Sequence, residues 1–122
     1  MNKYVFGRKA CVVALSLAPV LLAPSPAGAS SADWGYISGV YATSNGAILF
    51  NTSGTRTATP ACQSSSVPQR FAIDASTTAG QAAASLLITA YTLHRQVIVA
   101  GMGSCSIWPD TETVSVFQVS DS

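Results

Sequence analysis

The sequence has few charges, few cysteines and a single imidazole, and each shortage excludes a class of protein. Charged residues make up 9% of the 122 residues, with six Lys or Arg, five Asp or Glu and a formal net charge of +1. Nucleic-acid binding requires a concentration of basic side chains that neutralises phosphates, so we predict no nucleic-acid partner. The length leaves room for one ordinary domain only.

Residues that could perform catalysis or hold a metal are also scarce. His94 is the only histidine, no serine lies in a nucleophile-elbow sequence, and no C-x-x-C spacing occurs. A Ser-His-Asp triad needs a nucleophile beside the imidazole, whereas His94 near the end of a predicted helix is typical of a helix-end residue. Asp110 and Glu112 are too few to hold calcium without further ligands. We therefore predict no enzymatic activity, no metal and no cofactor.

The first 29 residues have the composition and order of a secretory leader. Three basic residues come first: Lys3, Arg8 and Lys9. An apolar run over residues 10–23 follows, and small residues occupy positions 27–29. The run is shorter than the roughly 20 apolar residues that span a bilayer. We expect cleavage after Ala29, with Ala32 as the alternative position, and a secreted or periplasmic product without a membrane contact.

The mature chain predicted in this way, residues 30–122, carries little charge. Removing the leader takes away three of the six basic residues and no acid, so the net charge becomes three minus five, or −2. Such a weak field neither steers anionic ligands nor holds a membrane surface. The solubility of the chain therefore depends on neutral polar side chains.

Two cysteines remain in the mature chain, Cys62 and Cys105. An isolated pair in a small exported domain predicts one disulfide, with a pair of free thiols as the alternative. In the chain-entropy model, closing a loop of this length contributes on the order of 4 kcal/mol to stability. That is a large contribution for a domain with a small core.

The pattern of apolar residues predicts five short strands and one helix. The strands cover residues 36–42, 47–51, 69–74, 97–100 and 113–119, with a tight hairpin turn at 44–46 and a long loop at 52–68. A helix follows residues 74–78, which offer several capping side chains, including the pair Thr78 and Gln81 at capping-box spacing. Its predicted inward stripe consists of Ala79, Ala82, Ala83, Leu86, Leu87, Ala90 and Leu93.

Five short strands with one helix between the third and the fourth is the order of the OB fold, a small and partly open Greek-key barrel. A plain five-stranded antiparallel sheet with one helix on its face gives the same order. We therefore predict a mainly β domain of the α+β type: a small five-stranded antiparallel OB-like barrel or sheet with one helix and one disulfide.

The segment 103–113 holds the candidate ligand contacts. It places Trp108, Asp110 and Glu112 close to the predicted disulfide. A rigid aromatic ring beside hydrogen-bonding acids suits a sugar or small polar ligand, with the ring against an apolar face and the acids accepting from hydroxyls. In the alternative interpretation Trp108 covers the disulfide, and Asp110 and Glu112 cap local amides. Large aromatics in small domains mostly lie in the core, and the same expectation applies to Trp34.

Several segments resemble a family of small exported bacterial proteins whose function is largely uncharacterised. The resemblance covers residues 60–119 and rests on four segments: 71–80, with Phe71-Ala72-Ile73-Asp74; 86–90, with Leu86-Leu87; Gly103-Ser104-Cys105; and Trp108 followed by Asp110-Thr111-Glu112-Thr113-Val114. Pro109 stands where family members carry glycine. The architecture is more remotely similar to the OB-fold B subunits of bacterial toxins, and that similarity implies a glycan ligand and a homo-oligomer.

Two functions follow from these features. The first is an exported, non-enzymatic binding module, with carbohydrate as the ligand class. The alternative is a structural or protein-interaction subunit that adds an open strand edge to a protein partner or to copies of itself, without a small-molecule ligand.

Overall fold

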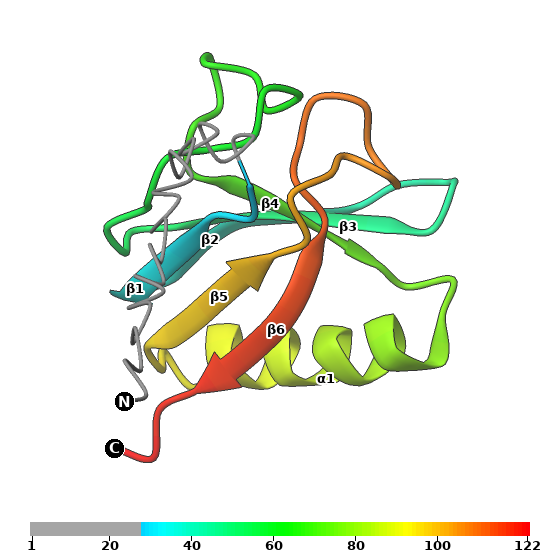
Figure 1. Ribbon diagram of the computed structural model, residues 1–122. Coiled ribbons are helices and arrows are strands. Elements are labelled where there is room, and N and C mark those ends of the chain that lie inside the picture. The colour runs from blue at the N-terminus through cyan, green and yellow to red at the C-terminus, as the bar shows by residue number, and fades with distance from the viewer. Residues whose placement is uncertain (1–27) are drawn as a thin grey trace, which may run out of the picture.

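The computed structural model describes residues 28–122, which form two three-stranded antiparallel sheets and one helix (Figure 1). One sheet has the order β1-β5-β6, with β1 at Ser31–Gly35, β5 at Val97–Gly101 and β6 at Val114–Val119. The other has the order β2-β3-β4, with β2 at Ile37–Ala42, β3 at Ala47–Thr52 and β4 at Arg70–Asp74. Helix α1 spans Thr78–Thr92. The leader prediction lies almost wholly outside the described residues.

The prediction of a mainly β domain with one helix is confirmed, but the strand count is wrong because β1 was missed. Its sequence Ser-Ala-Asp-Trp-Gly has no apolar alternation, and it becomes a strand because β5 pairs with it through Ser31–Ala100 and Ala32–Val99. The two sheets meet at a single parallel bridge between Ala72 and Thr113, so the barrel does not close.

The predicted hairpin and helix start follow local chemistry. Gly46 takes the left-handed conformation, with φ of 88°, in the turn between β2 and β3. The helix cap is Thr77, whose Oγ1 accepts from the Gly80 amide at 2.9 Å. The capping-box pair was therefore predicted one residue too late, and the Gln81 amide nitrogen donates to the carbonyl of Ala75 instead.

The buried face of α1 is narrower than the predicted stripe. Leu87 and Ala90 are buried, and Ala83 and Ala84 pack against the core. Four predicted inward residues are exposed: Ala79, Ala82, Leu86 and Leu93. Each residue turns the helix by about 100°, so the seven residues of the predicted stripe spread over a wide arc of the helix surface. That arc is wider than the part of the helix that a single sheet face can contact. The apolar side chains outside that arc face solvent.

The core is formed by buried side chains from both sheets and from α1, whose arrangement in space Figure 1 shows. Phe50 is its centre, with its ring 6.1 Å from Phe71 and 5.8 Å from Phe117 between ring centroids. These three rings come from β3, β4 and β6, so they join the two sheets where backbone pairing does not. Side-chain packing therefore holds the sheets together in place of barrel closure.

Adjacent leucines on α1 provide a test of this helix orientation. We expect Leu87→Ala to lower the free energy of unfolding by about 2–5 kcal/mol, because it empties a fully buried position. The matched change Leu86→Ala, at a side chain that is 44% exposed, stays within about 0.5 kcal/mol of the parent protein. Urea denaturation measures both values, and equal losses would contradict the orientation.

Candidate functional site

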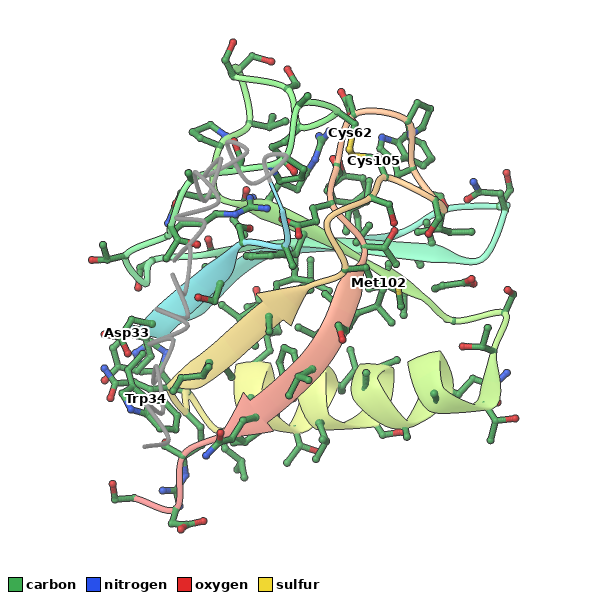
Figure 2. The ribbon with its side chains drawn as sticks, viewed as in Figure 1. Asp33, Trp34, Cys62, Met102 and Cys105 are labelled. Atoms are coloured by element: carbon green, nitrogen blue, oxygen red, sulfur yellow. A yellow bond between two sulfur atoms is a disulfide. The ribbon has the colours of Figure 1, made fainter. Side chains whose placement is uncertain are left out.

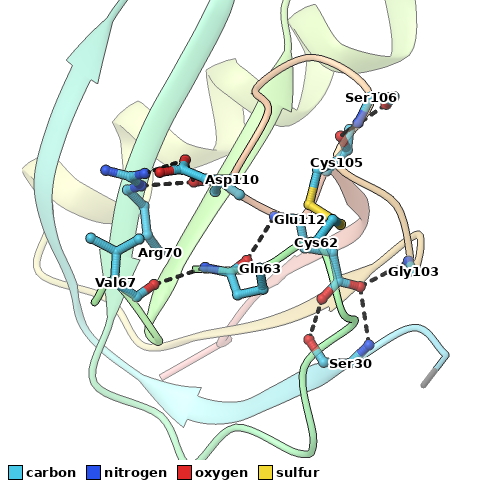
Figure 3. The surroundings of a disulfide bond; sticks show 12 residues. Ser30, Cys62, Gln63, Val67, Arg70, Gly103, Cys105, Ser106, Asp110 and Glu112 are labelled. Atoms are coloured by element: carbon cyan, nitrogen blue, oxygen red, sulfur yellow. Dashed lines mark hydrogen bonds and ion pairs between the residues drawn. A yellow bond between two sulfur atoms is a disulfide. The ribbon is translucent and has the colours of Figure 1, made fainter. Parts of the chain in front are cut away.

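The predicted disulfide is confirmed and joins two long loops. The sulfur atoms of Cys62 and Cys105 are 2.09 Å apart, with their Cα atoms 6.0 Å apart. Cys62 lies in the loop between β3 and β4, and Cys105 lies in the loop between β5 and β6 (Figure 3). The bridge thus fixes the segment that carries the three candidate ligand contacts against the loop that follows β3.

Trp108 and Asp110 lie in a tight turn at the surface. The Thr111 amide donates to the Trp108 carbonyl at 3.3 Å, and Pro109 occupies the second position of this turn. The Trp108 side chain is half-buried. Asp110 forms an ion pair with Arg70, with Oδ1 2.6 Å from Nη2, and its side chain is 49% exposed. The Asp110 carboxylate is thus already bound to a cation of the same chain.

Glu112 lies fully inside the protein, and Figure 3 shows its carboxylate beside Ser30 and Gly103. Its Oε1 accepts from Arg56 Nη2 at 2.9 Å and from the Ser30 hydroxyl, and its Oε2 accepts from the Ser30 and Gly103 amides at 3.0 and 2.8 Å. A Cβ at Gly101 would lie 2.0 Å from Oε2, so only glycine at this position lets the carboxylate approach. The end of β5 at Gly101 and the two residues after it are therefore built around Glu112.

The Arg56 side chain is nearly as enclosed as that of Glu112, and every one of its nitrogen atoms donates a hydrogen bond. Its Nε donates to the Ser30 hydroxyl at 2.9 Å, and Nη1 donates to the carbonyls of Pro68 and Arg70 at 2.6 and 3.0 Å. Its guanidinium carbon lies 3.8 Å above the centre of the Phe71 ring. Burial lowers the pKa of Arg56, while the hydrogen bond and charge of Glu112 act in the opposite direction. We call Ser30, Arg56, Gln63, Gly103 and Glu112 the Glu112 network.

This geometry replaces the predicted ligand role of Glu112 with a structural one. Both carboxylate oxygens are occupied by groups of the protein, and its side chain is 0% exposed, so no sugar hydroxyl can reach it. The alternative interpretation had Glu112 capping local amides, whereas the amides that it accepts from are those of Ser30 and Gly103, 82 and 9 residues away in the sequence. The ligand role of Trp108 and Asp110 stays a prediction.

An exposed tryptophan at the opposite end of the molecule was missed. Trp34 is 40% exposed, against the expectation of a core residue, and Figure 2 shows it far from Cys62 and Cys105. The pairing of β1 with β5 shifts register between Ala32 and Gly35, and this bulge makes the consecutive residues Asp33 and Trp34 both face outward. Bulges commonly re-aim side chains in this way at functional positions.

Two close backbone contacts hold the bulge. A Cβ at Gly35 would lie 2.0 Å from the Gly54 nitrogen, and a Cβ at Gly54 would lie 1.9 Å from the Asp33 carbonyl oxygen. Asp33 also donates from its amide to the Thr55 carbonyl at 2.9 Å, and its carboxylate accepts from the Trp34 amide at 2.8 Å. In the sequence, the only sign of this bulge is the presence of Gly35 and Gly54. Their contact in the structure explains why both positions need glycine.

The exposed Trp34 ring borders an open cavity of about 340 Å³. Polar side chains supply most of its lining: Gln96, Gln118, Ser120 and Asp121. Two residues after Trp34 and two residues before Gln96 in the sequence, the Tyr36 ring stacks on the His94 imidazole with centroids 4.3 Å apart and planes within 6°. We call Trp34, Gln96, Gln118 and Asp121 the Trp34 cavity.

His94 belongs to a helix end, as predicted, and has a further contact there. It adopts a left-handed backbone with φ of 51°, and the amides of His94 and Arg95 donate to the carbonyls of Tyr91 and Ala90 at 3.4 and 2.8 Å. These two bonds form a Schellman motif, which usually has glycine at the left-handed position. The stack with Tyr36 gives the histidine at this position a packing partner that glycine would lack.

Comparison with other proteins gives no assignment. No family model matches the chain, and neither the curated proteins nor the solved structures contain a significant match. Within residues 28–122, no three His, Cys, Asp or Glu side chains cluster as metal ligands would, and no helix combines the length and apolar character of a membrane span. The resemblances drawn from the sequence stay predictions.

The two ion pairs allow a matched test of the structural role of Glu112. We expect Glu112→Ala to cost about 3–5 kcal/mol of unfolding free energy, because it leaves the Arg56 charge buried and unpaired. Asp110→Ala breaks a pair with a half-exposed carboxylate and should cost no more than about 1 kcal/mol. Chemical denaturation of both variants checks the difference, and a loss at Glu112 as small as that at Asp110 would refute the structural role.

Proposed function

We propose that this protein is an exported, non-enzymatic carbohydrate-binding module whose ligand site is the Trp34 cavity. The observation that carries the proposal is the outward-facing Trp34 ring beside the amide side chains of Gln96 and Gln118. An indole ring contacts the apolar face of a sugar, and a side-chain amide both donates to and accepts from hydroxyl groups. A few such polar groups around one aromatic ring fit a small hydroxylated ligand.

The charge around the cavity disfavours an acidic sugar. Asp121 contributes a carboxylate to the lining, Asp33 lies next to Trp34 in the chain, and the lining contains no lysine or arginine. An acidic sugar would bring its carboxylate toward these acids without a cation to pair with it. Neutral hexoses and their oligomers carry no such penalty.

The two tryptophans provide the test, because one belongs to each candidate site. In an isothermal titration calorimetry experiment with neutral oligosaccharides chosen from a glycan array, we expect Trp34→Ala to weaken binding at least about tenfold, the loss of one stacking contact of about 1.4 kcal/mol. Trp108→Ala serves as the matched control and keeps the parent affinity. The reverse result would move the site to the turn at 108–111, and a glycan array without any response would remove the carbohydrate function.

A second candidate, a protein-interaction subunit, is favoured by the open edges of the sheets. In the described part of the chain, the outer edge of β1 meets Arg56 and that of β4 meets Thr113, whereas β2 and β6 each pair with one strand only. An unpaired edge offers its backbone amides and carbonyls to a strand of another chain. Val116 on β6 is 54% exposed and adds apolar surface at that edge.

Sedimentation of the mature protein tests this second function. If β6 takes a strand from another copy, the protein sediments above the monomer mass, and Val116→Lys shifts it to the monomer because a charge at the edge opposes pairing. Ile88→Lys, at an apolar α1 side chain that is 50% exposed, is the matched control and leaves the assembly intact. A parent protein that sediments only as a monomer, and recovers no protein partner in a pull-down, counts against it.

A further inference from the structure

Ser30 is the residue at which the chain enters the protein core. It is 1% exposed, whereas Gly28 and Ala29 before it are exposed. Its amide donates to Glu112 Oε2 at 3.0 Å, its hydroxyl contacts Glu112 Oε1 and Arg56 Nε, and its carbonyl accepts from the Gly101 amide at 2.8 Å. Every polar group of Ser30 is therefore used inside the Glu112 network.

This position coincides with one of the two cleavage positions that the leader pattern predicts. Cleavage after Ala32 would remove Ser30 together with Ala32, which is 1% exposed and pairs with both Val99 and Arg56. It would leave Glu112 and Arg56 buried without the groups that Ser30 supplies. Cleavage after Ala29 keeps all of these contacts and removes only exposed residues of the described chain.

We propose that an export peptidase hydrolyses the bond between Ala29 and Ser30, and that the α-ammonium group created on Ser30 pairs with Glu112 inside the Glu112 network. In this hydrolysis one water molecule adds across the peptide bond, so that Ala29 leaves with a carboxylate and Ser30 retains the nitrogen as an ammonium. The nitrogen already lies 3.0 Å from Glu112 Oε2, so the pair forms without a movement of the chain.

The charges around this nitrogen are compatible with an ammonium group. Glu112 faces it directly. Arg56 carries a positive charge that repels an ammonium group, but this charge is already paired with the other oxygen of the same carboxylate. Gly28 and Ala29 lie against Gly103, and their removal opens this side of Ser30 to water. Water there hydrates the two hydrogens that Glu112 does not bind, so the added charge is only partly desolvated.

The burial of Ser30 also sets the order of events. A peptidase needs an extended backbone on both sides of the bond, and in the folded protein the Ser30 side of this bond is enclosed. Cleavage must therefore precede folding, and the mature N-terminus becomes part of the core as the chain folds. The Glu112 network is completed by a group that only processing creates.

The composition of the chain provides a clean probe for the new amine. Lys3 and Lys9 are the only lysines and both lie in the leader, so the mature protein has a single primary amine at its N-terminus. The full chain is expressed with its leader in an exporting bacterium, and the product is characterised by N-terminal sequencing and intact mass. We expect a chain that begins at Ser30, and a product that begins at Asp33 would overturn the proposal.

Acetylation of the folded product then tests the ion pair. The neutral amine is the reacting species and pairing with Glu112 keeps the nitrogen protonated, so acetic anhydride at neutral pH should modify Ser30 at least about tenfold more slowly than an unpaired amine. The matched control is a refolded chain that begins at Gly28, whose amine precedes the core. Circular dichroism verifies that both forms are folded, and equal acetylation rates would overturn the ammonium–Glu112 pair.

Discussion

The buried ion pair between Arg56 and Glu112 is the interaction on which the position of the loops after β3 and β5 depends. Removing two charges from water costs several kcal/mol for each ion, and the structure offsets this cost only by giving every polar atom a partner. Among the described residues, no buried side-chain nitrogen or oxygen lacks a hydrogen bond. The partners come from the start of β1, the loop after β3 and the loop after β5, so the pair can exist only when all three are in place.

The disulfide and the Glu112 network constrain the same loops by different physical means. The covalent bond between Cys62 and Cys105 limits how far the two loops can separate in the unfolded chain, whereas the network fixes their orientation in the folded one. Gln63, the residue after Cys62, accepts from the Glu112 amide at 2.7 Å and donates to the Val67 carbonyl at 2.8 Å. The loops at this end of the molecule are thus held by a disulfide and by buried hydrogen bonds, whereas the opposite end carries the open cavity at Trp34.

The surfaces left outside the core carry the functional proposals. A domain with few charges keeps apolar groups at its surface, and here they occur on α1, on β6 and beside the bulge of β1. Beside the bulge, the exposed Trp34 ring and several polar side chains line one open cavity, which is why the carbohydrate site is placed there. The edges of β2 and β6 offer backbone groups instead, which suits a protein strand better than a small molecule.

The sequence by itself determined the elements whose signals are local. The hairpin at Gly46, five of the strands, the single helix and the pairing of Cys62 with Cys105 follow from turn chemistry, periodicity and cysteine count. Tertiary structure alone decided that 31–35 forms a strand, that α1 buries a narrow face, that Glu112 lies inside and that Trp34 lies outside. Those four outcomes depend on partners remote in the chain, because a bulge, a buried charge and a helix face are all set by what packs against them.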